Sequence, residues 1–190
     1  MKSVGTKRLE TNRLILRRFE VKDAKAMFET WANDEEVTKY LTWPVHGNID
    51  VTEALLREWV SNYKNEKYFH WVIEVKETNR IIGSIGVVGM REDIDLAHIG
   101  YCIAKDYWNK GYTSEAYKEV IRFLFEEVDI NRIESRFDTR NVYSGKVMEK
   151  CGLKYEGTLR QADRNNFGIC DSCYYGILRE EYFKNIRKIK

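Results

Sequence analysis

The sequence predicts an α/β (α+β) protein built on one mixed, mainly antiparallel sheet with helices on both faces. Short runs that alternate apolar and polar residues recur along the chain and are typical of half-buried strands. Amphipathic stretches with helical spacing lie between these runs. Their order is one strand, two or three helices, three strands, a helix, a strand, a helix and two strands. This order favours a sheet whose strands run in mixed directions.

The N-terminal part is expected to contribute one strand and several helices. Residues 13–19 alternate as a first strand, and Asp23 is a candidate N-cap for the first helix. Residues 33–36 and 50–53 each have the form of a capping box, which predicts two further helix starts. The loop between these helices, residues 43–47, holds the only proline of the chain.

The middle of the chain is expected to form three consecutive strands, over residues 71–76, 81–90 and 96–103. Three glycines, Gly83, Gly86 and Gly89, lie in the second of these strands. Their spacing does not fit a nucleotide-binding fingerprint and no helix follows them. Close strand packing or bulges therefore explain them better.

The C-terminal half is expected to form a helix, a strand, a second helix and a hairpin. Asn141 is a candidate cap for the second helix, which ends near Gly152. The basic residues from Lys184 to the C-terminus read as a solvated end. The predicted helix covers residues 113–128, the strand covers residues 133–138, and the hairpin strands cover residues 153–164 and 169–182.

Length and charge limit the possible classes of protein. At 190 residues we expect a single domain over residues 1–190 with a sizeable core. The formal charge of +2 gives no electrostatic case for binding nucleic acid or a membrane. No apolar run is long enough to span a bilayer, and residues 1–8 lack the apolar centre of a signal peptide. We therefore expect a cytoplasmic protein.

The four cysteines, at positions 102, 151, 170 and 173, do not form a disulfide framework in a chain of this length. Cys170 and Cys173 have the spacing of a redox or metal motif, but no second pair and no histidine lies nearby. We interpret them as two half-buried thiols in a strand, and we expect no metal site.

The segment over residues 107–116 reads as a strand-to-helix loop that ends at a helix N-terminus. Such a terminus presents free N–H groups and the positive end of the helix dipole, which stabilise an anion. Gly111 allows a positive φ and a close approach of a phosphate group. The spacing fits neither the Walker pattern nor the dinucleotide fingerprint.

Tyr-Trp-Asn-Lys-Gly-Tyr-Thr-Ser-Glu-Ala, residues 107–116, resembles the pyrophosphate loop of the GNAT acetyltransferases. Residues 11–19, 97–101, 141–153 and 171–182 also resemble motifs of that family, in the family order. The resemblance covers roughly residues 11–182 and is specific to the ribosomal-protein alanine N-acetyltransferase-like branch. It implies a seven-stranded sheet that splays between its fourth and fifth strands.

The resemblance implies acetyl-CoA as the donor and CoA as a product. The pyrophosphate would contact the loop, and the pantetheine arm would pair with the splayed edge of the fourth strand, which a bulge at Gly100 would open. The N–H of Ile103 or a neighbour would polarise the thioester carbonyl. The implied coenzyme-binding residues are Tyr101, Cys102, Ile103, Trp108, Asn109, Lys110, Gly111, Tyr112, Thr113, Ser114, Asn141 and Ser144.

Two positions depart from the family pattern. Thr113 replaces a small residue, and its branched carbon would crowd a phosphate or its hydroxyl would donate to one. Met148 stands where many members have a tyrosine that protonates the departing thiolate. For Lys110 a counter-charge to phosphate and a solvated loop lysine both stay open. Asn141 reads as a ligand of the pantetheine arm, as a helix cap, or as both.

The candidate catalytic residues are Ser144 and His98. Ser144 is expected to donate a proton or a hydrogen bond to the departing sulfur, and the alternative is an ordinary polar residue in the first helical turn. His98 stands where the branch often has glutamate, and an ordinary pKa of about 6.5 suits proton removal. The alternative for His98 is a structural hydrogen bond. His70 and His46 are weaker candidates.

These interpretations predict an acetyl-CoA-dependent N-acetyltransferase that acts by direct attack in a ternary complex. A protein α-amine, such as that of a ribosomal protein, is the first candidate acceptor, since a pKa of about 7.7–8.0 leaves a useful fraction neutral. A small amine acceptor (polyamine, amino acid or antibiotic) and a non-catalytic acetyl-CoA-binding module stay open. We expect the loop over residues 43–47, together with the neighbouring helices, to set acceptor selectivity. The aromatic content is compatible with a homodimer.

Overall fold

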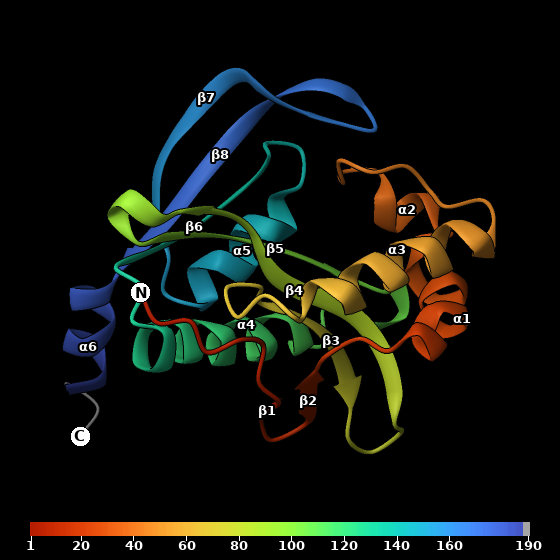
Figure 1. Cartoon of the computed structure of the whole chain (residues 1–190). Helices are drawn as coiled ribbons and strands as arrows, with labels where there is room; N and C mark the ends of the chain where they lie inside the picture. The colour runs from red at the N-terminus through yellow and green to blue at the C-terminus, as the bar shows by residue number, and fades with distance from the viewer. Residues whose placement is uncertain (188–190) are drawn as a thin grey trace.

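The computed structural model describes residues 1–187 and contains one sheet of eight strands (Figure 1). The strand order is β1-β2-β3-β4-β5-β6-β8-β7, and β5 and β6 are its parallel pair. The mixed, mainly antiparallel sheet is confirmed. The strands are β1 (Leu9–Glu10), β2 (Leu14–Arg17), β3 (His70–Val75), β4 (Arg80–Arg91), β5 (Leu96–Ile103), β6 (Arg132–Asp138), β7 (Lys154–Asn165) and β8 (Gly168–Leu178).

The predicted count of seven strands is wrong by one. The additional strand is β1, which pairs with β2 through Leu9 opposite Leu16 and Glu10 opposite Ile15. Two residues are too few to leave an alternating pattern in a sequence, since the period of a strand is itself two residues. Only the pairing with β2 makes this segment a strand.

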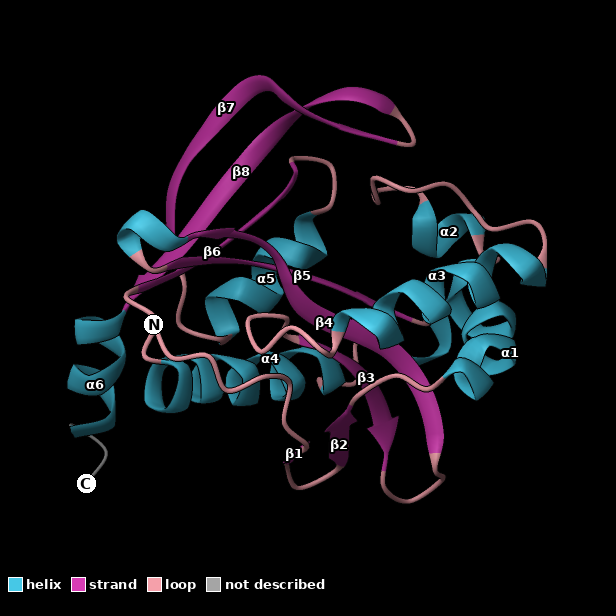
Figure 2. Ribbon diagram, in the orientation of Figure 1, coloured by secondary structure: helices cyan, strands magenta, loops and turns pink. Residues whose placement is uncertain are grey.

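Helices cover both faces of the sheet, as predicted. α1, α2 and α3 lie on one face, where the core includes Trp31 and Leu56, whereas α4 and α5 lie on the other face, where the core includes Tyr117 and Phe125. Figure 2 shows α1–α3 grouped at one end of the molecule, away from α5 and α6. The helices are η1 (Val21–Asp23), α1 (Ala24–Met27), η2 (Phe28–Ala32), α2 (Glu35–Thr38), α3 (Ile49–Asn62), η3 (Glu92–Ile94), η4 (Lys105–Tyr107), α4 (Tyr112–Phe123), η5 (Leu124–Val128), α5 (Val142–Lys150) and α6 (Arg179–Arg187).

The helix starts differ from the predicted caps. Asp23 does not cap α1, because η1 precedes this helix and already gives Asp23 a helical backbone (φ −71°, ψ −11°). Its carboxylate instead accepts the Glu20 N–H at 2.8 Å, as part of a capping box for η1, and two hydrogen bonds from the Arg17 guanidinium, at 2.8 and 3.0 Å. Asp34, rather than Asn33, caps α2. Asn48 caps α3, two residues before the predicted start. The sequence offers several possible caps close together, and the residue at which the helical backbone begins decides between them.

β5 and β6 separate soon after they meet, so the predicted splay is present. They pair only from Leu96 to His98 on β5, and the rest of β5 pairs with β4 alone. The bulge, however, is not at Gly100. It lies on β4 between Val87 and Gly89, and Gly100 instead makes room for the Val88 side chain, since a Cβ on Gly100 would lie 2.9 Å from Val88 Cγ1.

The glycines of β4 serve close packing, as predicted. A Cβ on Gly83 would lie 2.3 Å from the Cys102 carbonyl oxygen, and one on Gly86 would lie 2.5 Å from His70 Cδ2. Side chains at these two positions would therefore push the neighbouring strands apart.

The C-terminal hairpin is present but shorter than predicted. β8 ends at Leu178 rather than at residue 182, because the Glu181 carboxylate accepts the Leu178 N–H at 3.0 Å and α6 begins there. Lys184 to Arg187 belong to α6, and residues 188–190 lie outside the described part of the chain. Within residues 1–187, no helix combines the length and the apolar character that a membrane crossing needs.

Candidate active site

The loop between β5 and α4 is built around two left-handed residues. Asn109 has φ +58° and Gly111 has φ +78°, and α4 begins directly after Gly111. No acceptor for the N–H groups of residues 109–114 is found among the described residues. Six consecutive donors are therefore left without an acceptor in this part of the chain, at the positive end of α4, as at helix starts that bind anions.

Aromatic side chains fix the loop to β5. The Trp108 indole N–H donates to the Ile103 carbonyl at 2.8 Å, and the ring packs against the cores on both sides of the sheet. Tyr107 and Tyr112 lie ring to ring across the loop, 5.9 Å between centroids. The Lys110 ammonium lies 5.5 Å from the centre of the Tyr107 ring, at the exposed edge of the loop.

The edge of β5 that faces the splay carries unpaired backbone groups. Ala104 N–H donates to the Ile82 carbonyl of β4 at 2.8 Å. Backbone polar groups alternate in direction along a strand, so the groups of Tyr101 and Ile103 point away from β4 and into the splay. The Ile103 carbonyl accepts the Trp108 indole N–H. The Ile103 N–H and the N–H and carbonyl of Tyr101 are therefore the unpaired backbone groups on this edge.

The splay is bridged by hydroxyl groups at its narrow end. The Ser135 hydroxyl on β6 donates to the Ile99 carbonyl on β5 at 2.7 Å. The Tyr117 hydroxyl lies 2.6 Å from the Ser135 Oγ. Further along, the Tyr101 hydroxyl donates to the Ser144 carbonyl at 3.0 Å and lies 2.8 Å from the Ser144 Oγ. Burial raises the pKa of Tyr101, so its phenol keeps its proton.

Asn141 stands at the N-cap position of α5, but its side chain makes no capping hydrogen bond. The capping interpretation is therefore wrong for the side chain. Its backbone N–H donates to the Asp138 carbonyl at 2.7 Å, and this turn already fixes the helix start. Met148 is 1% exposed and belongs to the core under the sheet.

His98 is the last residue of β5 that pairs with β6. Its Nδ1 lies 3.4 Å from the Glu134 carboxylate. The pKa of His98 is lowered, chiefly by burial and further by the charge of Arg136, and Glu134 only partly offsets this. The imidazole is therefore neutral at pH 7 and able to accept a proton.

The two candidate catalytic residues flank the splay from opposite faces of the sheet. Positions 98 and 101 are three apart in a regular strand, so their side chains point to opposite faces. Tyr101 and its partner Ser144 lie on the face that carries α4 and α5, and His98 lies on the face that carries α1–α3. The structure thus brings one proton acceptor and one hydroxyl to the two sides of the same opening.

The other two histidines are held elsewhere. His46 Nδ1 lies 2.7 Å from the Thr52 hydroxyl, and His70 Nδ1 lies 3.0 Å from the Tyr68 hydroxyl. Burial lowers the pKa of His46, and it lowers that of His70 to about 4. Both side chains have structural partners, and neither belongs to the edge of the splay.

The cysteines are free thiols. Cys173 is half-buried in β8, as the sequence predicts, whereas Cys170 is buried rather than half-buried. Cys102 Sγ lies 3.5 Å from the Ser84 hydroxyl. Over residues 1–187 no group of three or more His, Cys, Asp or Glu side chains is placed to hold a metal ion.

One feature near this opening has no sequence signal. The tip of the β7–β8 hairpin reaches across to α2 (Figure 1), where the Asn166 amide donates to the carbonyls of Thr38 and Trp43, at 2.8 and 2.9 Å. The backbone N–H of Asn166 donates to the Leu41 carbonyl at 3.2 Å. The hairpin is thereby joined to the start of the loop over residues 43–47.

Comparison with known proteins identifies acetyltransferases as relatives of this chain. A family model described as an acetyltransferase (GNAT) domain matches residues 13–154. The uncharacterized N-acetyltransferase YoaA of Bacillus subtilis is 32% identical over 171 residues, which is 90% of this chain and 96% of that protein. A crystal structure of a GNAT-family acetyltransferase from Bacillus anthracis is 28% identical, with a TM-score of 0.82, and the match covers 92% of this chain and 100% of that one.

A more distant structure shares the fold. The ribosomal L7/L12 alpha-N-protein acetyltransferase RimL, solved in complex with coenzyme A, has a TM-score of 0.82 at 17% identity, over 92% of this chain and 99% of that one. The splayed sheet and the unpaired N–H groups at the start of α4 are both consistent with the family match over residues 13–154. The chain belongs to the GNAT acetyltransferase family, and it is an acyltransferase that uses acetyl-CoA as its donor.

Proposed function

We propose that the protein transfers the acetyl group of acetyl-CoA to a primary amine by direct attack in a ternary complex, and that a protein N-terminal α-amine is its first candidate acceptor. The observation that carries this proposal is the run of six unpaired N–H groups at residues 109–114, beside the unpaired edge of β5. The first suits two linked phosphates, and the second suits the amides of a pantetheine arm.

The residues at the opening fit this donor. A side chain at Gly111 would intrude where the backbone turns left-handed at the start of α4. The Asn141 amide has no hydrogen-bond partner within residues 1–187 and is free to bind the pantetheine arm. We assign to the Ile103 N–H the stabilisation of negative charge on the thioester oxygen. Bound acetyl-CoA supplies an activated acyl group with a thiolate as leaving group.

We assign the two proton transfers of the reaction to side chains on opposite faces of the sheet. His98, neutral at pH 7, accepts a proton from the attacking amine, directly or through a water molecule. Ser144 donates a hydrogen bond or proton to the departing sulfur on the other face. Tyr101 orients Ser144, since its hydroxyl contacts both the Oγ and the carbonyl of that residue.

Replacing Ser144 with alanine is expected to lower kcat about 100-fold while leaving the Kd for CoA within about twofold. General acid catalysis contributes at least about 100-fold when it acts in the transition state. Steady-state kinetics and titration calorimetry measure the two quantities. Ser61→Ala is the control, since that hydroxyl bonds only to Glu58 within an exposed part of α3. Unchanged kcat would remove Ser144 from the reaction, and a larger loss in Tyr101→Phe would move the role to the phenol.

Replacing His98 with glutamine is expected to remove the acid limb of the pH–rate profile. Because the pKa of His98 lies below 6.5, the wild-type kcat should fall as the pH drops below that value and the imidazole becomes protonated. The variant should be about 10-fold or more slower at pH 7 and should lack this bend. His46→Gln should retain the bend. A bend that persists in His98→Gln would assign proton removal to another group.

The bridge between the β7–β8 hairpin and α2 lies beside the loop over residues 43–47, where we expect the acceptor to bind. The Asn166 amide makes this bridge through the carbonyls of Thr38 and Trp43. A protein N-terminus is the first candidate acceptor, and a small amine is the second. Thiol release measured with peptides bearing a free α-amine, the same peptides α-blocked, and polyamines or amino acids separates the two. Turnover with blocked peptides or only with small amines would reject the protein acceptor.

A further inference from the structure

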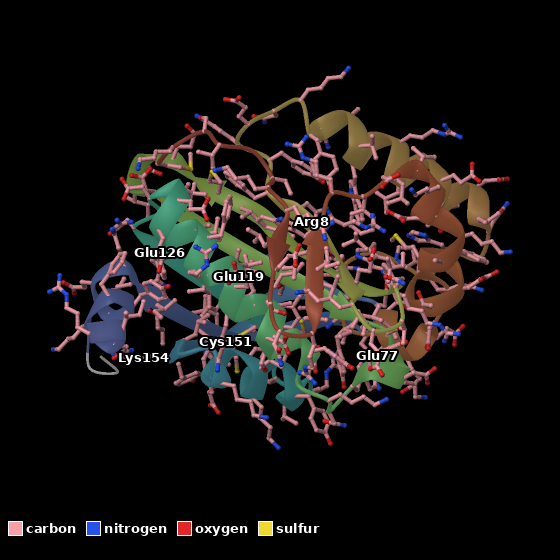
Figure 3. All side chains as sticks on the ribbon, turned by 90° about the horizontal axis from the view of Figure 1, so that it is seen from below. Arg8, Glu77, Glu119, Glu126, Cys151 and Lys154 are labelled. Carbon is pink, nitrogen blue, oxygen red and sulfur yellow. The ribbon has the colours of Figure 1, made fainter. Side chains whose placement is uncertain are left out.

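The turn between β1 and β2 contacts the start of α4 from outside the splay. Figure 3 looks onto the face with α4, and the label of Arg8 marks the chain just before β1, beside that helix. Arg13 makes the principal contacts. Its Nε donates to the Glu115 carboxylate at 2.7 Å, and its Nη1 donates to the Lys110 carbonyl at 3.1 Å. Its guanidinium lies 4.3 Å from the centre of the Tyr112 ring.

Glu115, in the first turn of α4, fixes the turn in return. Its Oε1 accepts the Thr11 hydroxyl at 2.6 Å and the Arg13 N–H at 2.9 Å. Burial alone would raise the pKa of Glu115, but the hydrogen bonds from Thr11 and Arg13 outweigh it and lower the pKa. The carboxylate therefore stays charged and holds both ends of the turn.

The position of the Lys110 carbonyl makes this contact important for the loop. Lys110 lies between the two left-handed residues, Asn109 and Gly111. Within residues 1–187, the Arg13 guanidinium is the hydrogen-bond donor to its carbonyl. Asparagine adopts the left-handed region more readily than most non-glycine residues, but it also adopts other conformations, so contacts from the surrounding structure help to hold Asn109 there. Arg13 supplies one at the neighbouring peptide.

The ion pair itself is a weak source of stability. The Arg13 side chain is 42% exposed, and ion pairs this exposed contribute little to the free energy of unfolding. The ion pair instead fixes the position of the loop relative to α4. The planar guanidinium joins the helix side chain at position 115 to the loop carbonyl at position 110, which a single ammonium group could not do with the same fixed spacing.

We infer that Arg13 is a positioning residue for the coenzyme site, and that the turn Thr11–Arg13 braces the loop in the conformation that presents the N–H groups of residues 109–114. The inference rests on the proposed function, because it assumes that this loop binds the pyrophosphate. A loop that already has its binding conformation loses less conformational entropy when the donor binds. We therefore expect the contacts of Arg13 to affect the affinity for the donor rather than the chemical step.

The test compares two donors on the intact protein. Acetyl-CoA contains the pyrophosphate, and acetyl-pantetheine lacks it. Arg13→Gln is expected to raise KM for acetyl-CoA about 10-fold and to leave kcat within about twofold, while kcat/KM for acetyl-pantetheine is unchanged. Glu115→Gln should do the same, and the double variant should lose less than the product of the two single effects. Arg13→Lys should fall between Arg13→Gln and the wild type.

Arg8→Gln is the matched control, since this neighbouring arginine pairs with Glu10 at 3.0 Å and does not contact the loop. It should leave both donors unaffected. An equal loss with acetyl-pantetheine in Arg13→Gln would show a general structural role and overturn the inference, and so would an unchanged KM for acetyl-CoA. If the wild-type protein does not prefer acetyl-CoA over acetyl-pantetheine, the phosphate site itself fails, and the brace fails with it.

Discussion

Replacing Gly111 with aspartate is expected to weaken CoA binding by about 100-fold or more. Aspartate tolerates the left-handed conformation of this position (φ +78°) better than most residues, so the backbone is largely kept while a negative charge enters the site. Two like charges about 4 Å apart at an effective dielectric constant of about 20 repel by roughly 4 kcal/mol. Titration calorimetry with CoA measures the loss.

The new carboxylate also meets Arg13. A Cβ at position 111 would lie 3.5 Å from Arg13 Nη2, so part of the charge is expected to pair with this guanidinium and draw it away from Glu115. Gly111→Ala separates the effects, since it adds bulk and strain without charge and should bind CoA with intermediate affinity. Gly47→Asp is the control, because Gly47 has φ +60° and open space at its Cβ position. Equal CoA affinity in Gly111→Asp and the wild type would contradict the loop assignment.

Acidification from pH 6.5 to pH 4.5 is expected to remove about 2 kcal/mol of the free energy of unfolding through His70. The pKa of this imidazole is lowered by burial to about 4, against an ordinary value of 6.5. Its ring packs against Trp59, with centroids 4.3 Å apart, and lies near Phe19. Each pKa unit corresponds to about 1.4 kcal/mol.

The sign follows from which state takes up the proton. Above pH 6.5 the imidazole is neutral in both states. Below it the unfolded chain binds a proton that the folded protein excludes, so stability falls until the pH reaches the folded pKa. His46 and His98 have lowered pKa values and act in the same direction.

Chemical denaturation at a series of pH values measures this dependence. The slope of the unfolding free energy against pH should approach one proton for His70 alone, and His70→Gln should lose that part of the slope while keeping the parts due to His46 and His98. Arg8→Gln should leave the slope unchanged. A wild-type protein of equal stability at pH 6.5 and pH 4.5 would contradict the buried, neutral state of His70.

The parts of the site that are local in sequence were predictable. The helix start after Gly111 and the strand before it each leave a pattern within about ten residues, because glycine conformation and strand periodicity are local properties. The splay between β5 and β6 was predictable only from the family resemblance. Nothing in the composition of residues 96–103 and 133–138 says where their pairing stops, and the bulge proved to lie at Val88 of a third strand.

Contacts between distant residues were not predictable. Tyr101 meets Ser144 across 43 positions, and Arg13 meets Glu115 across 102 positions. Either pair exists only once the sheet has placed its strands, so a single sequence carries no signal for it. The wrong cap at Asp23 has a local cause. The helical segment begins at Val21, so Asp23 lies inside it, and its carboxylate accepts the Glu20 N–H in a capping box.

A crystal structure of the protein with bound CoA is the most direct measurement. It should show pyrophosphate oxygens within hydrogen-bond distance of the N–H groups of residues 109–114, and pantetheine amides paired with the backbone of Tyr101 and Ile103. Its sulfur should lie beside Ser144. A coenzyme bound elsewhere, or phosphates held by side chains while these N–H groups stay unpaired, would contradict the assignment of this site.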